Sequence, residues 1–209
     1  SLCVHQSRTI GCCLDSLPMK ISTQSPSRPR WQHPEDPPGP ARYVLEHLGF
    51  RRQEARVLGP PARSMGRPRL MAIHGAGADY TQLNPLLYGL QQRGVGSLAM
   101  NLSGHSDAGG GAPAMVSVDF NVKEALRFGE RLKPGLLALL AVDMGAMVAL
   151  RAAQVHALSL HRLVLIDPFF YPDTAFNRPL SQVLNCPSLR WEQSRLLEVL
   201  QQYMGQVMV

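Results

Sequence analysis

One stretch, residues 135–153, constrains the fold more than any other part of this 209-residue chain. Residues 136–142 form an unbroken apolar run that is too short to cross a membrane and has the length of a strand buried on both faces of a parallel sheet. Residues 144–153 are rich in Met, Ala, Leu and Arg, which are strong helix formers. The pattern therefore predicts a buried strand followed almost at once by a helix, with Asp143 at the junction.

Two interpretations of Asp143 follow from this segment. Residues 141–145, Ala-Val-Asp-Met-Gly, have the shape of the G-x-S-x-G nucleophile elbow, with Ala for the first Gly and Asp for Ser. In that motif a sharp strand-to-helix turn exposes the nucleophile. Asp is also favoured as a helix N-cap, where its carboxylate accepts backbone N–H bonds. The segment alone leaves both interpretations open.

The charge distribution argues against a nucleic-acid partner. The net charge is +6, but residues 1–69 hold 11 Lys and Arg against 5 Asp and Glu, whereas residues 70–209 hold 10 of each. The basic side chains do not alternate with aromatic ones as a nucleic-acid surface requires. We therefore expect no nucleic-acid partner. No segment has the length and hydropathy of a membrane span, so we expect no membrane span either. The oligomeric state stays open.

The cysteines and the N-terminal segment bear on location. The four cysteines, at positions 3, 12, 13 and 186, form neither a disulfide framework nor a metal-binding spacing, which favours an intracellular, cytoplasmic protein. Residues 1–40 are rich in Ser, Arg, Gln and Pro, and we expect a disordered or leader segment there. Residues 19–34 lack acidic side chains, as transit peptides do, so organelle import is the alternative.

Strand and helix patterns alternate through the rest of the chain. Short apolar runs predict strands at residues 70–73, 96–100, 136–142 and 162–166, and helical stripes cover residues 83–93 and 118–132. The fold class is therefore α/β, with a mostly parallel sheet and flanking helices. Residues 41–69 are interpreted as an N-terminal extension and linker, in which residues 41–58 fit either a hairpin or a short helix.

Four motifs in order resemble the α/β-hydrolase fold family. They are His74-Gly75 after the first strand, the turn Asn101-Leu-Ser-Gly-His-Ser after the second, the elbow at residues 141–145, and Asp167-Pro168 after the next strand. The turn departs from the family's Asp-x-Pro-Gly-His-Gly at three positions. The resemblance covers roughly residues 70–172, which we assign as an α/β-hydrolase core.

The resemblance implies a role for each matching position. Asp143 would be the nucleophile, and the backbone N–H groups of Ala76 and Met144 would form the oxyanion hole. Family members with Asp here are the epoxide hydrolases and haloalkane dehalogenases, in which the carboxylate attacks carbon and a His then activates water. This implies a hydrolase acting on a small epoxide- or ester-type molecule through a covalent aspartyl intermediate, without metal or cofactor.

Several features depart from a complete enzyme of that type. Met144 stands where those members carry Trp, and Ala146 where they carry Gly. A general-base His after the last strand is missing: His156 and His161 lie at the wrong end of the elbow helix, and His105 matches a structural turn position. Asp167 is either a triad acid or a strand-end residue that takes local backbone hydrogen bonds. The alternative is therefore a non-catalytic binding or scaffold protein of the same fold.

The last segment is expected to begin a helical cap. Residues 173–209 follow the core, and residues 188–204 carry an amphipathic helical stripe. We expect the sequence to be an N-terminal portion of the fold, truncated before its last strands, with the strand near Leu163 left as an unpaired sheet edge.

Overall fold

In the computed structural model of the chain, every described residue belongs to the second of two units, residues 36–209. The structure describes residues 37–48, 51–60, 68–105, 112–132, 138–155, 162–168, 173–185 and 206–208. The expectation of a disordered or leader segment at residues 1–40 falls almost wholly outside this part, as does the amphipathic stripe at residues 188–204.

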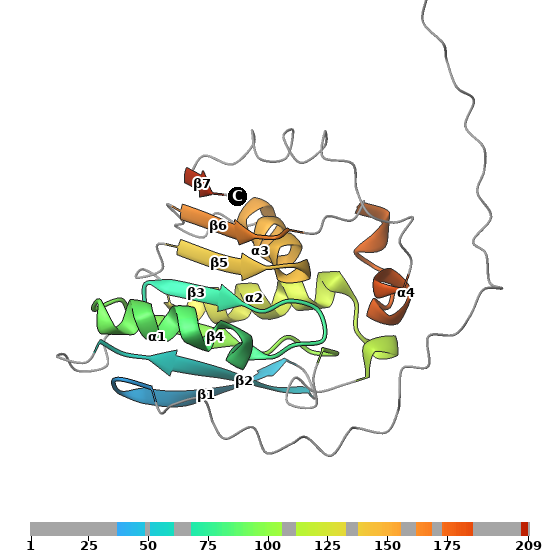
Figure 1. Ribbon diagram of the computed structural model, residues 1–209. Helices are drawn as coiled ribbons and strands as arrows, with labels where there is room; N and C mark the ends of the chain where they lie inside the picture. The colour runs from blue at the N-terminus through green and yellow to red at the C-terminus, as the bar shows by residue number, and fades with distance from the viewer. Residues whose placement is uncertain are drawn as a thin grey trace, which may run out of the picture. The chain divides into compact units, whose positions relative to one another are not determined.

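A seven-stranded sheet organises the second unit (Figure 1), with the order β1-β2-β4-β3-β5-β6-β7. The strands β3 to β7 run parallel to one another, whereas β2 is antiparallel to both β1 and β4. The predicted α/β fold with a mostly parallel sheet is confirmed. The strands are β1 (Ala41–Leu48), β2 (Arg51–Leu58), β3 (Leu70–Ile73), β4 (Ser97–Met100), β5 (Ala138–Val142), β6 (Arg162–Ile166) and β7 (Gln206–Met208).

Residues 41–58 form the hairpin rather than the short helix. The strands β1 and β2 pair antiparallel from Ala41 opposite Leu58 to Leu48 opposite Arg51. The second strand, β2, continues the pairing onto β4, so the hairpin belongs to the same sheet as the parallel strands. Sequence pattern alone could not choose between the two forms, because the choice depends on this long-range pairing with β4.

The helices cover the two faces of the sheet. One apolar cluster joins β3, β4, β5 and β6 to α2 (Val118–Leu132) and α3 (Met144–Val155), and a second joins the opposite strand faces to α1 (Asn84–Gln92). Alternate residues of one strand divide between the clusters, as Met71 and Ala72 of β3 do, because successive side chains point to opposite faces. A short α4 (Leu180–Leu184) and three 3₁₀ turns (Tyr80–Leu83, Pro113–Met115 and Asp173–Ala175) complete the described elements.

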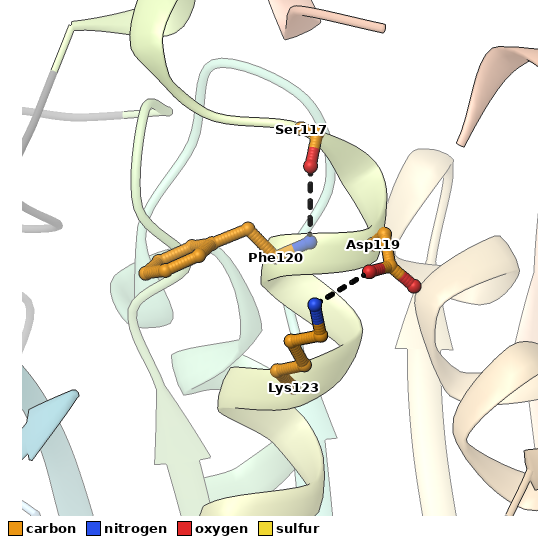
Figure 2. Close-up of polar contacts among 4 residues, drawn as sticks. All are labelled: Ser117, Asp119, Phe120 and Lys123. Carbon is orange, nitrogen blue, oxygen red and sulfur yellow. Dashed lines mark hydrogen bonds and ion pairs between the residues drawn. The ribbon is translucent and has the colours of Figure 1, made fainter. Parts of the chain in front are cut away.

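The start of α2 is fixed by a capping serine, which Figure 2 shows. The Ser117 hydroxyl oxygen accepts the Phe120 N–H at 3.2 Å, the bond that an N-cap side chain makes to the third helical residue. Asp119 lies in the first turn, where a negative charge favours the helix dipole, and it pairs with Lys123 one turn later at 2.9 Å. This start sets which α2 residues face the sheet.

The expectation of an unpaired edge at β6 is wrong. Residues Gln206–Met208 form β7, which pairs in parallel with Arg162–Val164 of β6. Residues 173–209 were predicted to begin a helical cap, and a three-residue strand carries too little pattern to be recognised within them. Among the described helices, none has the length and hydropathy needed to span a bilayer.

Candidate active site

Asp143 occupies a tight turn between β5 and α3. Its φ is +52°, in the left-handed region that non-glycine residues seldom adopt, and such a backbone costs on the order of 1 to 3 kcal/mol. The Asp143 N–H donates to the Ile166 carbonyl of β6 at 3.0 Å, and its carbonyl accepts the Ala146 N–H at 3.1 Å. An N-cap residue has extended backbone instead, so this geometry disfavours the interpretation of Asp143 as an ordinary cap.

Two glycines allow the turn to pack directly on the loop after β3. A Cβ on Gly145 would lie 2.3 Å from the His74 carbonyl oxygen, and a Cβ on Gly75 would lie 2.9 Å from the Cβ of Asp143. Both distances are shorter than real Cβ contacts allow. The two glycines therefore let the β5–α3 turn lie directly against the β3 loop.

This approach places the Asp143 carboxylate on the N–H of Ala76. The Oδ2 atom accepts that N–H at 2.9 Å, although the two residues are 67 positions apart in the sequence. Met144 opens α3 and its side chain is buried. The first N–H groups of a helix have no intrahelical acceptor, so the Met144 N–H lies at the same positive helix end. The structure thus gathers the three predicted site residues, and the carboxylate itself takes the Ala76 donor.

The β3 loop presents three consecutive N–H groups to three side-chain acceptors. Gly75 donates to Gln82 Oε1 at 2.8 Å, Ala76 to Asp143 Oδ2 at 2.9 Å, and Gly77 to His105 Nδ1 at 3.2 Å. Gln82, which lies in the 3₁₀ turn before α1, was not predicted as a site residue from the sequence. No local sequence pattern indicates this residue, because its hydrogen bond to Gly75 forms only once the β3 loop has folded against the 3₁₀ turn.

His74 directly follows β3 and is fully buried. Its Nδ1–H donates to the Gly75 carbonyl at 2.7 Å, and its Nε2 accepts the Leu102 N–H at 3.0 Å. Burial lowers the pKa of His74, which keeps the ring neutral. The Nδ1 bond stays within the β3 loop, and the Nε2 bond joins that loop to the loop after β4, so both nitrogens of His74 are used in holding these loops.

A buried polar network lies beneath these loops. Asn121 Nδ2 donates to Glu124 Oε2 at 3.0 Å and to the Ser103 carbonyl at 3.1 Å, and the Ser103 N–H donates to Glu124 Oε2 at 3.1 Å. Burial raises the pKa of Glu124 above its ordinary value, against the effect of these hydrogen bonds. Glu124 was not predicted from the sequence, although a charged side chain next to Ala125 of the apolar stripe was a signal that could have identified it.

Asp167 follows β6 at the same edge of the sheet as Asp143. The two aspartates come directly after Val142 and Ile166, which are paired across β5 and β6. Asp167 also has a left-handed backbone, with φ +45°, and is exposed. His156 and His161 lie outside the described residues. In the part that the structure describes, no group of three His, Cys, Asp or Glu side chains could hold a metal ion.

Comparisons with known proteins agree with this architecture. The family model described as the alpha/beta hydrolase family matches residues 70–207. A search of curated proteins gave no match.

Three solved structures illustrate the likeness. A thioesterase domain from the curacin biosynthetic pathway is 20% identical with a TM-score of 0.56, over 72% of this chain and 52% of that one. The alpha/beta hydrolase GrgF from Penicillium sp. sh18 is 15% identical with a TM-score of 0.52, over 62% and 46%. A candidate epoxide hydrolase from Pseudomonas aeruginosa is 21% identical with a TM-score of 0.51, over 64% and 43%. The chain thus spans about half the length of these structures, which share its fold.

Proposed function

The chain belongs to the alpha/beta hydrolase family, and on that premise we propose that it acts on a small electrophilic molecule through Asp143 as a covalent nucleophile. The observation that carries the proposal is the position of the Asp143 carboxylate, which stands on a left-handed strand-to-helix turn with Oδ2 on the Ala76 N–H. Backbone strain of this kind persists where the surrounding structure enforces it and is common at active sites.

The hydrogen bond from Ala76 assigns different roles to the two carboxylate oxygens. Oδ2 is held by the N–H, so Oδ1 is the oxygen that attacks. With an epoxide, Oδ1 forms a bond to a ring carbon, the ring carbon–oxygen bond breaks, and the alkoxide takes a proton from solvent. The product is a hydroxyalkyl ester of Asp143 whose carbonyl oxygen is Oδ2, already on the Ala76 donor. A carboxylate needs no base for this step.

The same bond favours epoxides over esters as the substrate class. An ester substrate needs an open oxyanion hole for its own carbonyl oxygen, whereas here Oδ2 takes the Ala76 donor. Attack on an sp³ carbon of an epoxide develops no oxyanion at that position. We therefore infer an epoxide-type substrate.

Hydrolysis of the aspartyl ester needs a base, and the two described histidines near the site do not fit that role. Both rings are buried, and each uses its two nitrogens in hydrogen bonds to neighbouring loops or to Asn121. Burial also lowers the pKa of both rings. The proposal therefore concerns formation of the ester, which we expect to persist long enough to be detected.

Intact-protein mass spectrometry after incubation with styrene oxide tests the proposal. We expect one added probe mass on the wild-type chain, because ring opening adds the whole epoxide. Asp143→Asn should abolish the adduct. Asp167→Asn is the matched control, since Asp167 is an exposed aspartate with the same left-handed backbone at the same sheet edge. Equal labelling of Asp143→Asn and wild type would refute the proposal.

The second candidate is a non-catalytic binding protein. It is favoured by the same 2.9 Å bond, because a carboxylate satisfied by a backbone N–H is a stabilised anion and a weaker nucleophile. In this case a small molecule would bind without reacting. Saturable, reversible binding of styrene glycol in calorimetry, together with an unlabelled wild-type protein, would support this candidate over the first.

A further inference from the structure

We propose that His105 is a positioning residue for the Asp143 site: it holds the Gly77 N–H and thereby keeps the neighbouring Ala76 N–H directed at the carboxylate. This inference deepens the proposed function and rests on it for its catalytic meaning. The starting observation is that Gly75 and Gly77, on either side of Ala76, are anchored by Gln82 and His105. With both neighbours anchored, the Ala76 amide has little freedom to turn.

The bend of the loop lies at Gly77 itself. Its φ is +67°, and no other atom lies within 4 Å of the position that a Cβ would take. Within the loop, the Ala78 N–H donates to the Gly75 carbonyl at 3.4 Å and closes the turn across Ala76 and Gly77. The bond from its N–H to His105 Nδ1, at 3.2 Å, holds this bend against the loop after β4.

The Asn121 side chain determines which nitrogen of His105 accepts. Both hydrogens of Asn121 Nδ2 have acceptors, the Ser103 carbonyl and Glu124 Oε2, so Oδ1 is the atom that faces His105. The Oδ1 atom lies 3.3 Å from His105 Nε2, which must therefore carry the proton. Nδ1 is then the unprotonated nitrogen, as the bond from Gly77 requires. A chain of hydrogen bonds thus runs from α2 to the β3 loop.

The surroundings of His105 keep its ring neutral and in place. The ionisable groups that face it in the described structure are His74, whose ring lies edge-on with centroids 5.6 Å apart, and Glu124, which acts through Asn121. Burial, and then His74, lowers the pKa of His105 to about 4. The preceding Gly104 has φ +79°, and a Cβ there would lie 3.0 Å from Leu180 and 3.1 Å from Val116. Packing at Gly104 therefore fixes the path of the loop into His105.

Two variants at one position separate this role from general stability. His105→Leu removes the acceptor at similar size, whereas His105→Asn keeps an oxygen close to the place of Nδ1. On the full ¹⁵N-labelled chain, we expect His105→Leu to speed amide hydrogen exchange at both Gly77 and Ala76 by about tenfold, the scale of one hydrogen bond. His105→Asn should restore slow exchange. Faster exchange at Gly77 with no change at Ala76 would overturn the proposal.

A second measurement applies if His105→Leu does not fold. Asp143→Asn removes the carboxylate at position 143, so a change in the Ala76 amide shift on acidification cannot come from that group. We then expect the ¹⁵N shifts of Ala76 and Gly77 to move together on acidification, with one midpoint near pH 4, because protonated Nδ1 cannot accept the Gly77 N–H. A constant Ala76 shift while Gly77 moves would overturn the positioning role.

The outcomes for His105 and for Asp143 are distinguishable. If styrene oxide fails to label Asp143 but the two amides respond together, the positioning role stands and the catalytic proposal falls. If Asp143 is labelled and His105→Leu leaves the labelling rate unchanged, the catalytic proposal stands and the positioning role falls. When both hold, His105→Leu lowers the labelling rate and His105→Asn restores it.

Discussion

Gly145 is the residue whose replacement most sharply tests the packing of the candidate site. In Gly145→Ala the new Cβ would lie 2.3 Å from the His74 carbonyl oxygen and 3.0 Å from two Ile73 atoms. Ordinary van der Waals contact begins at 3.4 Å, so the start of α3 must move away from β3 by about 1 Å. The closest contact is backbone, so no side-chain rotation relieves it. We expect a loss of about 3 kcal/mol in the free energy of unfolding, the upper end of ordinary overpacking.

The matched control is Gly89→Ala in the middle of α1. There the new Cβ would meet only the flexible end of Arg93 at 3.5 Å, and alanine gains about 0.5 to 1 kcal/mol over glycine in a helix. Urea unfolding followed by circular dichroism measures both variants. The two substitutions should change stability in opposite directions, although the chemical change is identical. A Gly145→Ala variant within about 1 kcal/mol of wild type would refute the close approach of α3 to β3.

Three further predictions concern the titrating and strained residues. His105 has a folded pKa of about 4 against 6.5 when unfolded, so the unfolded chain binds more protons between these values. The free energy of unfolding should therefore rise by about 3 kcal/mol from pH 4 to 6.5, and a difference curve against His105→Asn measures this. The pKa of Glu124 is raised by burial, so its contribution to the free energy of unfolding falls as the pH rises above 4.5. Glu124→Gln should be more stable than wild type at pH 7, and this difference should vanish near pH 4. An equal difference at both pH values would contradict the raised pKa of Glu124. Asp167→Val should lose about 2 kcal/mol in urea unfolding because β-branched residues fit φ +45° poorly, whereas Asp167→Asn should stay within about 0.5 kcal/mol.

Local periodicity accounts for the part of the fold that the sequence predicts well. The predicted helix over residues 118–132 and strand over residues 162–166 coincide with α2 and β6. Both have a strong, uninterrupted apolar pattern that needs no distant partner to be recognised. The hairpin at residues 41–58 and the strand β7 depend on pairing with distant segments, and local pattern did not specify either.

The candidate site shows the same division. Motif order placed Asp143, Ala76 and Met144 in one region, because strand ends of a parallel sheet meet at one edge. The hydrogen bond from the Ala76 N–H to the Asp143 carboxylate was not predictable, because it joins residues 67 positions apart and depends on two glycines that let the β5–α3 turn approach the β3 loop. Gln82 and Asn121 were missed for a similar reason: their partners belong to other loops.

The identity of the residue that carries the ester is the most direct test of the account. Trypsin should release residues 132–151 as one peptide, since Pro134 protects Lys133, and Asp143 is the only aspartate or glutamate within it. After incubation with styrene oxide, we predict that this peptide gains one probe mass, that fragment ions place the mass on Asp143, and that hydroxylamine removes it as expected for an ester. A probe mass on Met144 or Met147 that resists hydroxylamine, or an unmodified peptide, would contradict the role of Asp143 as nucleophile.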